Sequence, residues 1–272
     1  MTDANAKFEG SIPENYDRYL GPVLFEPYAR DLACRLEVQD GARVLEVACG
    51  TGIATRHLRD RLPPGARFVA TDLNQPMLDH ARRKLAATGG IEWRPADACA
   101  LPFPDASFDA VLCQFGLMFV PDKAAALGEA RRVLARGGTF LFNVWDSLER
   151  NRFARIAHET VAGFFPDDPP TFYQVPFSLH REDELRPLLA GAGFERVRIE
   201  RLSCDGESPS ARELAIGLVE GNPVANAIRE RGGIEIGRVK EAVAAAIGRA
   251  FGDRPVRIPL HALVVTARSG AA

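Results

Sequence analysis

The sequence predicts an α/β fold: a doubly wound, seven-stranded mixed sheet with a helical insertion between the last two strands. In the first half, short apolar runs alternate with helical patterns of about 10–14 residues, an order typical of a parallel sheet with helices on both faces. Turn signals rich in glycine and proline separate these units. In the second half, the last two strand patterns are separated by about 48 residues, 206–253, with helical periodicity.

The expected elements follow one another in a regular order. A helical stretch at 14–38 comes first, with breaks expected at Pro22 and Pro27. Strands are then expected at 43–48, 67–71, 91–95, 108–114, 139–145, 195–204 and 256–268. The helices between the first five strands are expected at 53–62, 74–85 and 122–135. This order places the carboxyl ends of the first five strands at one edge of the sheet, where ligands bind in such folds.

Composition excludes several classes of protein. Of the 272 residues, 46% are apolar and 26% charged, as in soluble globular proteins, and the net charge of −2 argues against a nucleic-acid binder. The sequence has no apolar run long enough for a membrane span and no secretory signal, so we expect a cytoplasmic protein. Five scattered cysteines without a C-x-x-C pair predict neither disulfides nor a metal site.

A glycine-rich turn follows the first predicted strand, in the stretch VLEVACGTG at 44–52. Gly50 and Gly52 allow the backbone to adopt positive φ and to approach a ligand closely. A dinucleotide-binding turn reads G-x-G-x-x-G and would need a third glycine at position 55, which is Thr55. The sequence therefore disfavours a dinucleotide-dependent oxidoreductase, which remains an alternative.

Three acidic residues accompany this turn. Glu46 lies inside the first predicted strand, while Asp72 and Asp97 follow the second and third strands. A carboxylate at Asp72 can accept hydrogen bonds from two ribose hydroxyls, and Asp97 can bind an exocyclic amine of adenine. Three acids at one edge of the sheet would repel a pyrophosphate, so they favour a cationic nucleoside without phosphate.

Four segments carry a resemblance to a known family: 44–52 (VLEVACGTG), 69–82 (VATDLNQPMLDHAR), 96–122 (ADACALPFPDASFDAVLCQFGLMFVPD) and 129–145 (EARRVLARGGTFLFNVW). In order and in register, they make residues 40–146 resemble the Rossmann-like class I S-adenosylmethionine-dependent methyltransferases. The resemblance is greatest to the type 11 small-molecule branch, which includes ubiquinone and menaquinone biosynthesis enzymes. The family's first motif reads E/D-x-G-x-G-x-G, and this chain has Ala48 in place of the first glycine.

The resemblance implies S-adenosylmethionine as the methyl donor, S-adenosylhomocysteine as its product, and no metal. The implied cofactor-binding residues are Glu46 (through water), Ala48, Gly50, Gly52, Gln114 and Phe115 around the methionine part; Asp72 at the ribose; Leu73, Met77, Asp97 and Ala98 around the adenine; and Tyr16 and Tyr19 closing over the ligand. Aromatic rings beside a sulfonium cation are physically favourable.

The implied reaction is an in-line methyl transfer to oxygen, nitrogen or carbon, and its main requirement is alignment of the reactants. We expect no catalytic base: His158, His180 and His261 read as structural or exposed. Aromatic residues are frequent at 115–119 and 164–177, which favours a planar or lipophilic small-molecule acceptor. The catalytic residues, the acceptor's identity and the oligomeric state stay open, with a homodimer as one option.

The chain divides into five expected segments, with these boundaries: an N-terminal helical cap over the site at 1–40; an S-adenosylmethionine-binding core at 41–146; a helix, loop and returning helix–strand at 147–205; a helical insertion near the acceptor pocket at 206–253; and a final strand and tail at 254–272. A protein that binds S-adenosylmethionine without catalysis is the main alternative, because binding residues alone do not establish turnover.

Overall fold

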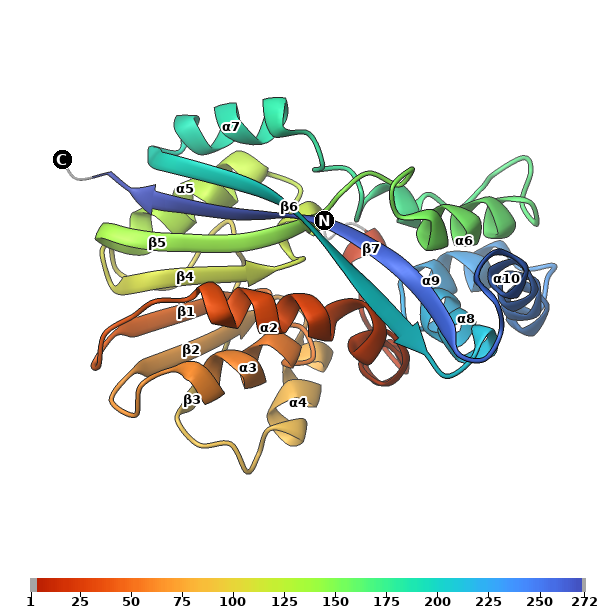
Figure 1. Cartoon of the computed structure of the whole chain (residues 1–272), viewed down its shortest axis with the longest axis horizontal. Helices are drawn as coiled ribbons and strands as arrows, with labels where there is room; N and C mark the ends of the chain where they lie inside the picture. The colour runs from red at the N-terminus through yellow and green to blue at the C-terminus, as the bar shows by residue number, and fades with distance from the viewer. Residues whose placement is uncertain (1–3, 271–272) are drawn as a thin grey trace.

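The computed structural model describes residues 4–270 and confirms the α/β fold with a seven-stranded mixed sheet (Figure 1). The strands are β1 (Arg43–Val47), β2 (Arg67–Asp72), β3 (Ile91–Pro95), β4 (Phe108–Gln114), β5 (Leu134–Trp145), β6 (Phe194–Ser208) and β7 (Val256–Ser269). Their spatial order is β3-β2-β1-β4-β5-β7-β6, with β1 to β5 parallel and β7 antiparallel to both of its neighbours. The strand order reverses between β1 and β4, which is where such sheets open a binding crevice.

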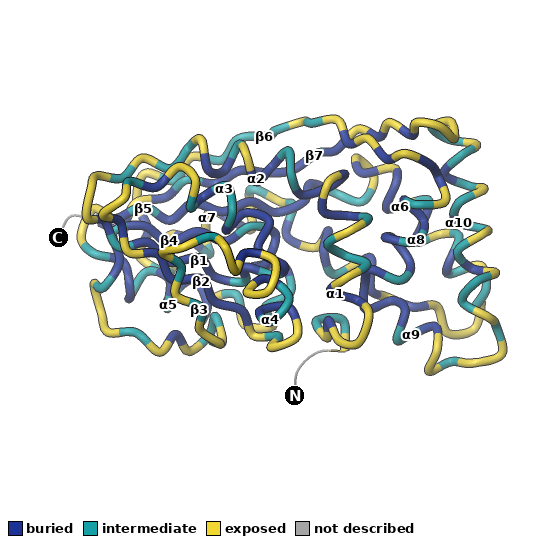
Figure 2. The backbone as a smooth tube through the Cα atoms, turned by 90° about the horizontal axis from the view of Figure 1, so that it is seen from below, coloured by how far each residue is buried: buried dark blue, intermediate teal, exposed yellow. Residues whose placement is uncertain are grey.

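Helices cover both faces of the sheet, as right-handed crossovers require when the strand order reverses. On one face lie α2 (Glu26–Arg35) and α3 (Ile53–Arg61), and α4 (Gln75–Lys84) follows β2; α5 (Lys123–Val133) and α7 (Glu182–Gly191) lie on the opposite side (Figures 1 and 2). Short 3₁₀ turns are η1 (Ala4–Ala6), η3 (Leu117–Phe119) and η4 (Phe172–Gln174).

A group of helices lies beyond the carboxyl ends of the parallel strands (Figure 1). It consists of α6 (Arg152–Ala162), α8 (Ala211–Glu220), α9 (Val224–Arg231) and α10 (Ile236–Phe251). The long strands β6 and β7 reach from the sheet to this group, and α8 is largely buried, as the strands β1 and β4 are (Figure 2). One continuous apolar cluster includes Val111 of β4, Leu214 of α8 and Val243 of α10. The helical group is therefore packed on the same core as the sheet.

The N-terminal helical stretch differs from its prediction, because neither proline breaks it. After α1 (Ile12–Asn15), residues Tyr16–Phe25 form a π-helix, η2, that contains Pro22 and continues directly into α2. Pro22 has no N–H to donate, and the wider π turn accommodates it without ending the helix. Pro27 falls in the first turn of α2, where backbone N–H groups have no helical partner.

Two other boundaries also move. β6 runs on to Ser208, so the helices of the 206–253 segment begin only at Ala211. β5 begins at Leu134, directly after α5, and not at 139. β6 is longer than predicted because it pairs with β7 as far as Ser208. β5 begins earlier than predicted because Leu134 pairs with Phe108 of β4.

Candidate functional site

A cavity of about 370 Å³ opens at the carboxyl ends of β1, β2 and β4. Most of the residues predicted to bind the cofactor line it: Tyr16, Ala48, Gly50, Asp72, Leu73, Met77, Asp97, Ala98, Gln114 and Phe115. They come from separate parts of the chain, and the parallel strands bring them together at one edge. The structure also adds lining residues that the sequence reasoning missed, among them Phe8, Asn74 and Phe119. Nothing in the local pattern around Phe8 indicated this position.

The turn after β1 has left-handed backbone at Ala48 (φ 55°), Gly50 (φ 56°) and Gly52 (φ 77°). This conformation costs an alanine roughly 1–2 kcal/mol, since its Cβ crowds the backbone. The Cβ of Ala48 also fills space beside Gly116: a Cβ at position 116 would lie 2.4 Å from it. Ala48, at the first glycine position of the motif, is thus accommodated by Gly116 in the loop after β4.

Asp72, at the end of β2, holds two backbone turns together. Its Oδ2 accepts from the Gly50 N–H (2.8 Å) and its Oδ1 from the Asn74 N–H (2.7 Å). Burial raises the pKa of Asp72, while the N–H groups of Asn74 and Gly50 oppose this by stabilising the carboxylate. A carboxylate has about four lone-pair sites, so Asp72 can still accept hydrogen bonds from two ligand hydroxyls.

Glu46 is a buried acid with no partner. Its side chain is 1% exposed, and neither carboxylate oxygen has a hydrogen-bond partner among residues 4–270. Burial raises the pKa of Glu46 to about 8; the nearby Thr55 hydroxyl, although it forms no hydrogen bond of normal geometry with Glu46, opposes the rise, and the Asp72 charge adds to it. Glu46 lines not the large cavity but a smaller one of about 30 Å³, which also touches Tyr16, Gly50 and Gln114. That space is enough for about one water, so Glu46 could act on a ligand only through such a bridge.

Two predicted residues, Gly52 and Tyr19, lie outside the lining of these cavities. A Cβ at Gly52 would lie 3.1 Å from both Ala81 Cβ and Leu85 Cδ1, so this glycine allows α3 to approach α4. Tyr19 is half-buried, and the guanidinium carbon of Arg18 lies 5.2 Å from the centroid of the Tyr19 ring. In an α-helix, positions 16 and 19 would share a face, but the wider turn of the π-helix rotates Tyr19 away from the face of Tyr16.

The adenine end of the cavity is more open. Asp97 is exposed and accepts from the Cys99 N–H (2.8 Å), which shapes the loop after β3. Leu73 is 53% exposed, the one large apolar side chain among the described residues that is so open. Met77 is buried against Phe8 and Ile12 in a small cluster apart from the main core. An apolar slot edged by an acid is compatible in its chemistry with an adenine ring.

At the other end, Gln114 and Phe115 leave β4 toward the N-terminal helix. The Gln114 side-chain amide donates to the Phe25 carbonyl (2.9 Å) and so ties the end of the π-helix to the sheet. Phe115 has positive φ (50°), and its N–H donates to the side-chain oxygen of Asn143 on β5 (3.0 Å). This turn aims the Phe115 ring at Trp145, with the two rings stacked at 4.1 Å.

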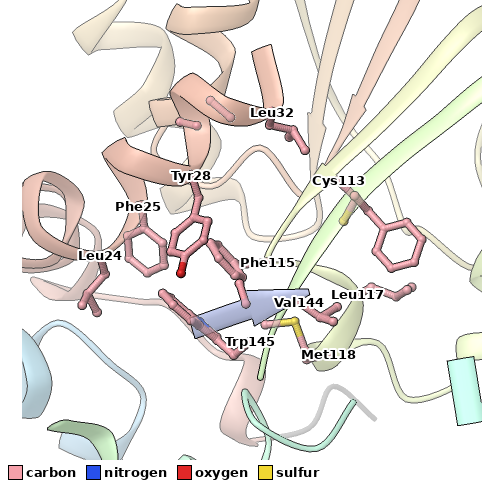
Figure 3. Close-up of a cluster of buried hydrophobic side chains, with 14 of the residues drawn as sticks. Leu24, Phe25, Tyr28, Leu32, Cys113, Phe115, Leu117, Met118, Val144 and Trp145 are labelled. Atoms are coloured by element: carbon pink, nitrogen blue, oxygen red, sulfur yellow. The ribbon is translucent and has the colours of Figure 1, made fainter. Parts of the chain in front are cut away.

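A second cavity of about 40 Å³, called here the aromatic cavity, adjoins the first. Figure 3 shows part of its wall, where Phe25, Phe115 and Trp145 lie close to one another and Tyr28 packs edge-on against Phe115 and Trp145. Its lining residues are Phe8, Tyr16, Leu20, Leu24, Phe25, Phe115, Phe119, Trp145, Phe153, Ala154, Phe172, Tyr173, Pro176, Phe177, Leu218 and Asn222. Phe8, Tyr16, Phe115 and Phe119 line both cavities and form the junction between them.

The histidines considered as bases lie outside the lining of both cavities. His261 pairs with Ser203 across β6 and β7 (Nδ1–Oγ 2.8 Å), and His180 Nδ1 lies 2.8 Å from the Phe177 carbonyl. His158 Nδ1 is buried without a partner among the described residues. Within residues 4–270, no cluster of His, Cys, Asp and Glu side chains could hold a metal ion. Among the helices of the same described residues, none has the length and apolar character of a membrane span.

Comparisons with known proteins agree with this geometry. The family described as "Methyltransferase domain" matches residues 45–142. A demethylmenaquinone methyltransferase of Thermus thermophilus is 37% identical over 172 residues, covering 59% of this chain and 77% of its own. A ubiquinone/menaquinone biosynthesis C-methyltransferase of Stenotrophomonas maltophilia is 30% identical over 209 residues, covering 71% of this chain and 83% of its own.

The chain belongs to the class I S-adenosylmethionine-dependent methyltransferases. Solved structures agree in fold: a putative methyltransferase of Bacillus halodurans superposes with a TM-score of 0.58 at 20% identity, covering 89% of this chain and 99% of its own. A phosphoethanolamine N-methyltransferase of Haemonchus contortus, solved with S-adenosylmethionine, superposes with a TM-score of 0.61 at 15% identity, covering 95% of this chain and 57% of its own. The protein is therefore a methyltransferase that uses S-adenosylmethionine to methylate a small molecule.

The residues present fit this methyl donor on physical grounds. S-adenosylmethionine carries a sulfonium and an ammonium but no phosphate. The buried Asp72 would repel a pyrophosphate, whereas a cation near Glu46 would favour ionisation of that carboxyl, which keeps its proton in the empty site. The absence of a third glycine, noted in the sequence, agrees with a turn that binds no pyrophosphate.

Proposed function

We propose that the methyltransferase holds S-adenosylmethionine in the 370 Å³ cavity and methylates a planar, lipophilic acceptor in the aromatic cavity. The observation that carries this proposal is the junction: Phe8, Tyr16, Phe115 and Phe119 line both cavities. An acceptor and a methyl donor in adjoining cavities meet at this shared wall. Two relatives named as methyltransferases of quinone biosynthesis support an aromatic acceptor.

In this proposal the cofactor supplies a methyl group activated by the sulfonium charge, and the protein aligns it. Asp72 binds the ribose hydroxyls while it keeps the turns at Gly50 and Asn74 in place. Leu73, Met77 and Asp97 enclose the adenine. Glu46 acts through water on the ammonium group.

The rings of Tyr16 and Phe115 flank the sulfonium, a favourable contact for a cation. With the aromatic cavity behind them, they hold the acceptor atom in line with the methyl group, and alignment is the main requirement of the transfer. Neither cavity is lined by histidine, so the proposal assigns no base to the protein.

The proposal gives four of the five segments a role. Residues 1–40 cap the site through Phe8 and Tyr16, and 41–146 form the cofactor-binding core. The acceptor wall is built from η2, from the 147–205 segment through Phe153 and Phe172, and from the 206–253 segment through Leu218.

A cavity-filling variant tests the proposal. Ala154 of α6 is buried, and it lines the aromatic cavity but not the 370 Å³ cavity. Ala154→Leu should abolish methyl transfer to planar aromatic compounds while calorimetry shows unchanged binding of S-adenosylmethionine. Ala6→Leu, at the rim of the larger cavity, is the matched control and should weaken cofactor binding instead. Full transfer activity in Ala154→Leu would show that the acceptor binds elsewhere.

A further inference from the structure

The aromatic cavity has one polar end, formed by Tyr173 of η4 and Asn222 of the loop between α8 and α9. Both side chains are buried, with 2% and 8% exposure. The Tyr173 hydroxyl donates to the Leu218 carbonyl at 2.7 Å, and the Asn222 side-chain nitrogen donates to the same carbonyl at 3.0 Å. Two side chains from different segments thus converge on one backbone oxygen of α8.

The donors at this end are already engaged. A tyrosine hydroxyl has one hydrogen to donate, and that of Tyr173 is directed to Leu218. The second hydrogen of the Asn222 amide faces the Gly217 carbonyl at 3.5 Å, so the two carbonyls orient the amide with its nitrogen toward α8. What remains is acceptor capacity: the lone pairs of Tyr173 Oη and Asn222 Oδ1. Within residues 4–270, no hydrogen-bond donor reaches either oxygen.

We propose that Tyr173 Oη and Asn222 Oδ1 bind an O–H or N–H group of the acceptor, so that the enzyme selects planar aromatic molecules carrying such a donor. This inference rests on the proposed function of the aromatic cavity. An acceptor without a donor at this position leaves the free lone pairs of both oxygens desolvated and without a hydrogen bond, which lowers its affinity. The rest of the lining is apolar or aromatic apart from Tyr16 at the junction.

Entry of the acceptor requires the cavity wall to move, and Phe8 at the junction is less firmly held than the polar end. The aromatic cavity of about 40 Å³ is smaller than an aromatic ring; a cavity that binds benzene measures roughly 150 Å³. Phe8, at the junction, packs with Ile12 and Met77 in a cluster separate from the main core. Tyr173 and Leu218 belong to the main core. The polar end is therefore the fixed part of the cavity, against which a ring is oriented.

The test uses two probes of nearly equal shape, 2-naphthol and 2-methoxynaphthalene, because only the first has a hydrogen to donate. Binding to the full chain saturated with S-adenosylhomocysteine is measured by equilibrium dialysis. The wild type should prefer 2-naphthol by about tenfold, the value of one net hydrogen bond. Tyr173→Phe should reduce the preference to about threefold or less, with binding of 2-methoxynaphthalene unchanged.

Tyr28→Phe is the matched control. Tyr28 is fully buried, and its hydroxyl also donates to a backbone carbonyl, that of Leu202 at 3.2 Å, but it lines neither cavity. This variant should keep the tenfold preference. Equal binding of both probes by the wild type, or an unchanged preference in Tyr173→Phe, would overturn the inference while leaving the acceptor cavity in place. Failure of both probes to bind, with S-adenosylhomocysteine bound normally, would overturn the proposed function and this inference with it.

Discussion

Glu46→Gln should remove a pH dependence from the stability of the cofactor-free protein. Both oxygens of Glu46 are buried without partners, and its pKa is raised from 4.5 to about 8. The folded state therefore keeps a proton that the unfolded state has lost. Stability is highest below the unfolded pKa and falls as the pH rises toward the folded pKa, with no further loss above it.

The size of the effect follows from the two pKa values. One pKa unit corresponds to about 1.4 kcal/mol, so the full penalty for ionising Glu46 in the empty site is at most about 5 kcal/mol. Roughly half of it, about 2.5 kcal/mol, develops between about pH 6 and pH 9. Glutamine does not titrate, so the variant lacks this component while other groups contribute similarly to both proteins.

The assay is urea unfolding of wild type and Glu46→Gln at several pH values between about 6 and 9, without cofactor. The difference in unfolding free energy should shift by about 2.5 kcal/mol in favour of the variant as the pH rises. Parallel pH profiles would refute the reasoning, because they would show that Glu46 is already ionised or solvated in the free protein. A cationic ligand favours the carboxylate, so S-adenosylmethionine should bind the wild type more tightly as the pH rises toward 8, and this trend should vanish in the variant.

Two further predictions concern the neighbouring turn and strand end. Ala48→Gly should raise the unfolding free energy by about 1 kcal/mol, because it removes an alanine with left-handed backbone. The same change should restore part of the stability lost in Gly116→Ala, because the new Cβ at position 116 would clash with Ala48 Cβ. The rescue is partial because the close contact of that Cβ with Cys113 Sγ, at 2.9 Å, persists. Urea unfolding checks both, and a destabilised Ala48→Gly would contradict the strain argument. Asp72→Asn should weaken S-adenosylmethionine binding by roughly 1.5–3 kcal/mol in calorimetry. Asp79→Asn on α4, whose carboxylate lines neither cavity, should bind normally. Equal affinities of wild type and Asp72→Asn would exclude the ribose role.

The cofactor end of the site could be predicted from sequence because its geometry is local. Most of the lining residues there stand at or just after the end of a strand, and parallel strands bring those ends to one edge whatever packs around them. Asp72 and Asp97 are examples, and both line the cavity. The strand order reverses beside Gly50, and the glycine spacing together with the neighbouring acids distinguishes this turn from a dinucleotide site.

The acceptor side depended on tertiary structure. Periodicity predicts which face of an α-helix two residues share, but it could not foresee the π-helix that separates Tyr19 from Tyr16. The aromatic cavity assembles side chains as distant in sequence as Phe8 and Asn222, and only the packing of the helical group against the sheet brings them together. The motifs, through their resemblance to a known family, implied the methyl donor, and the aromatic residues at 115–119 and 164–177 favoured a lipophilic acceptor. The hydrogen-bond chemistry at Tyr173 became visible only when two segments met on one carbonyl of α8.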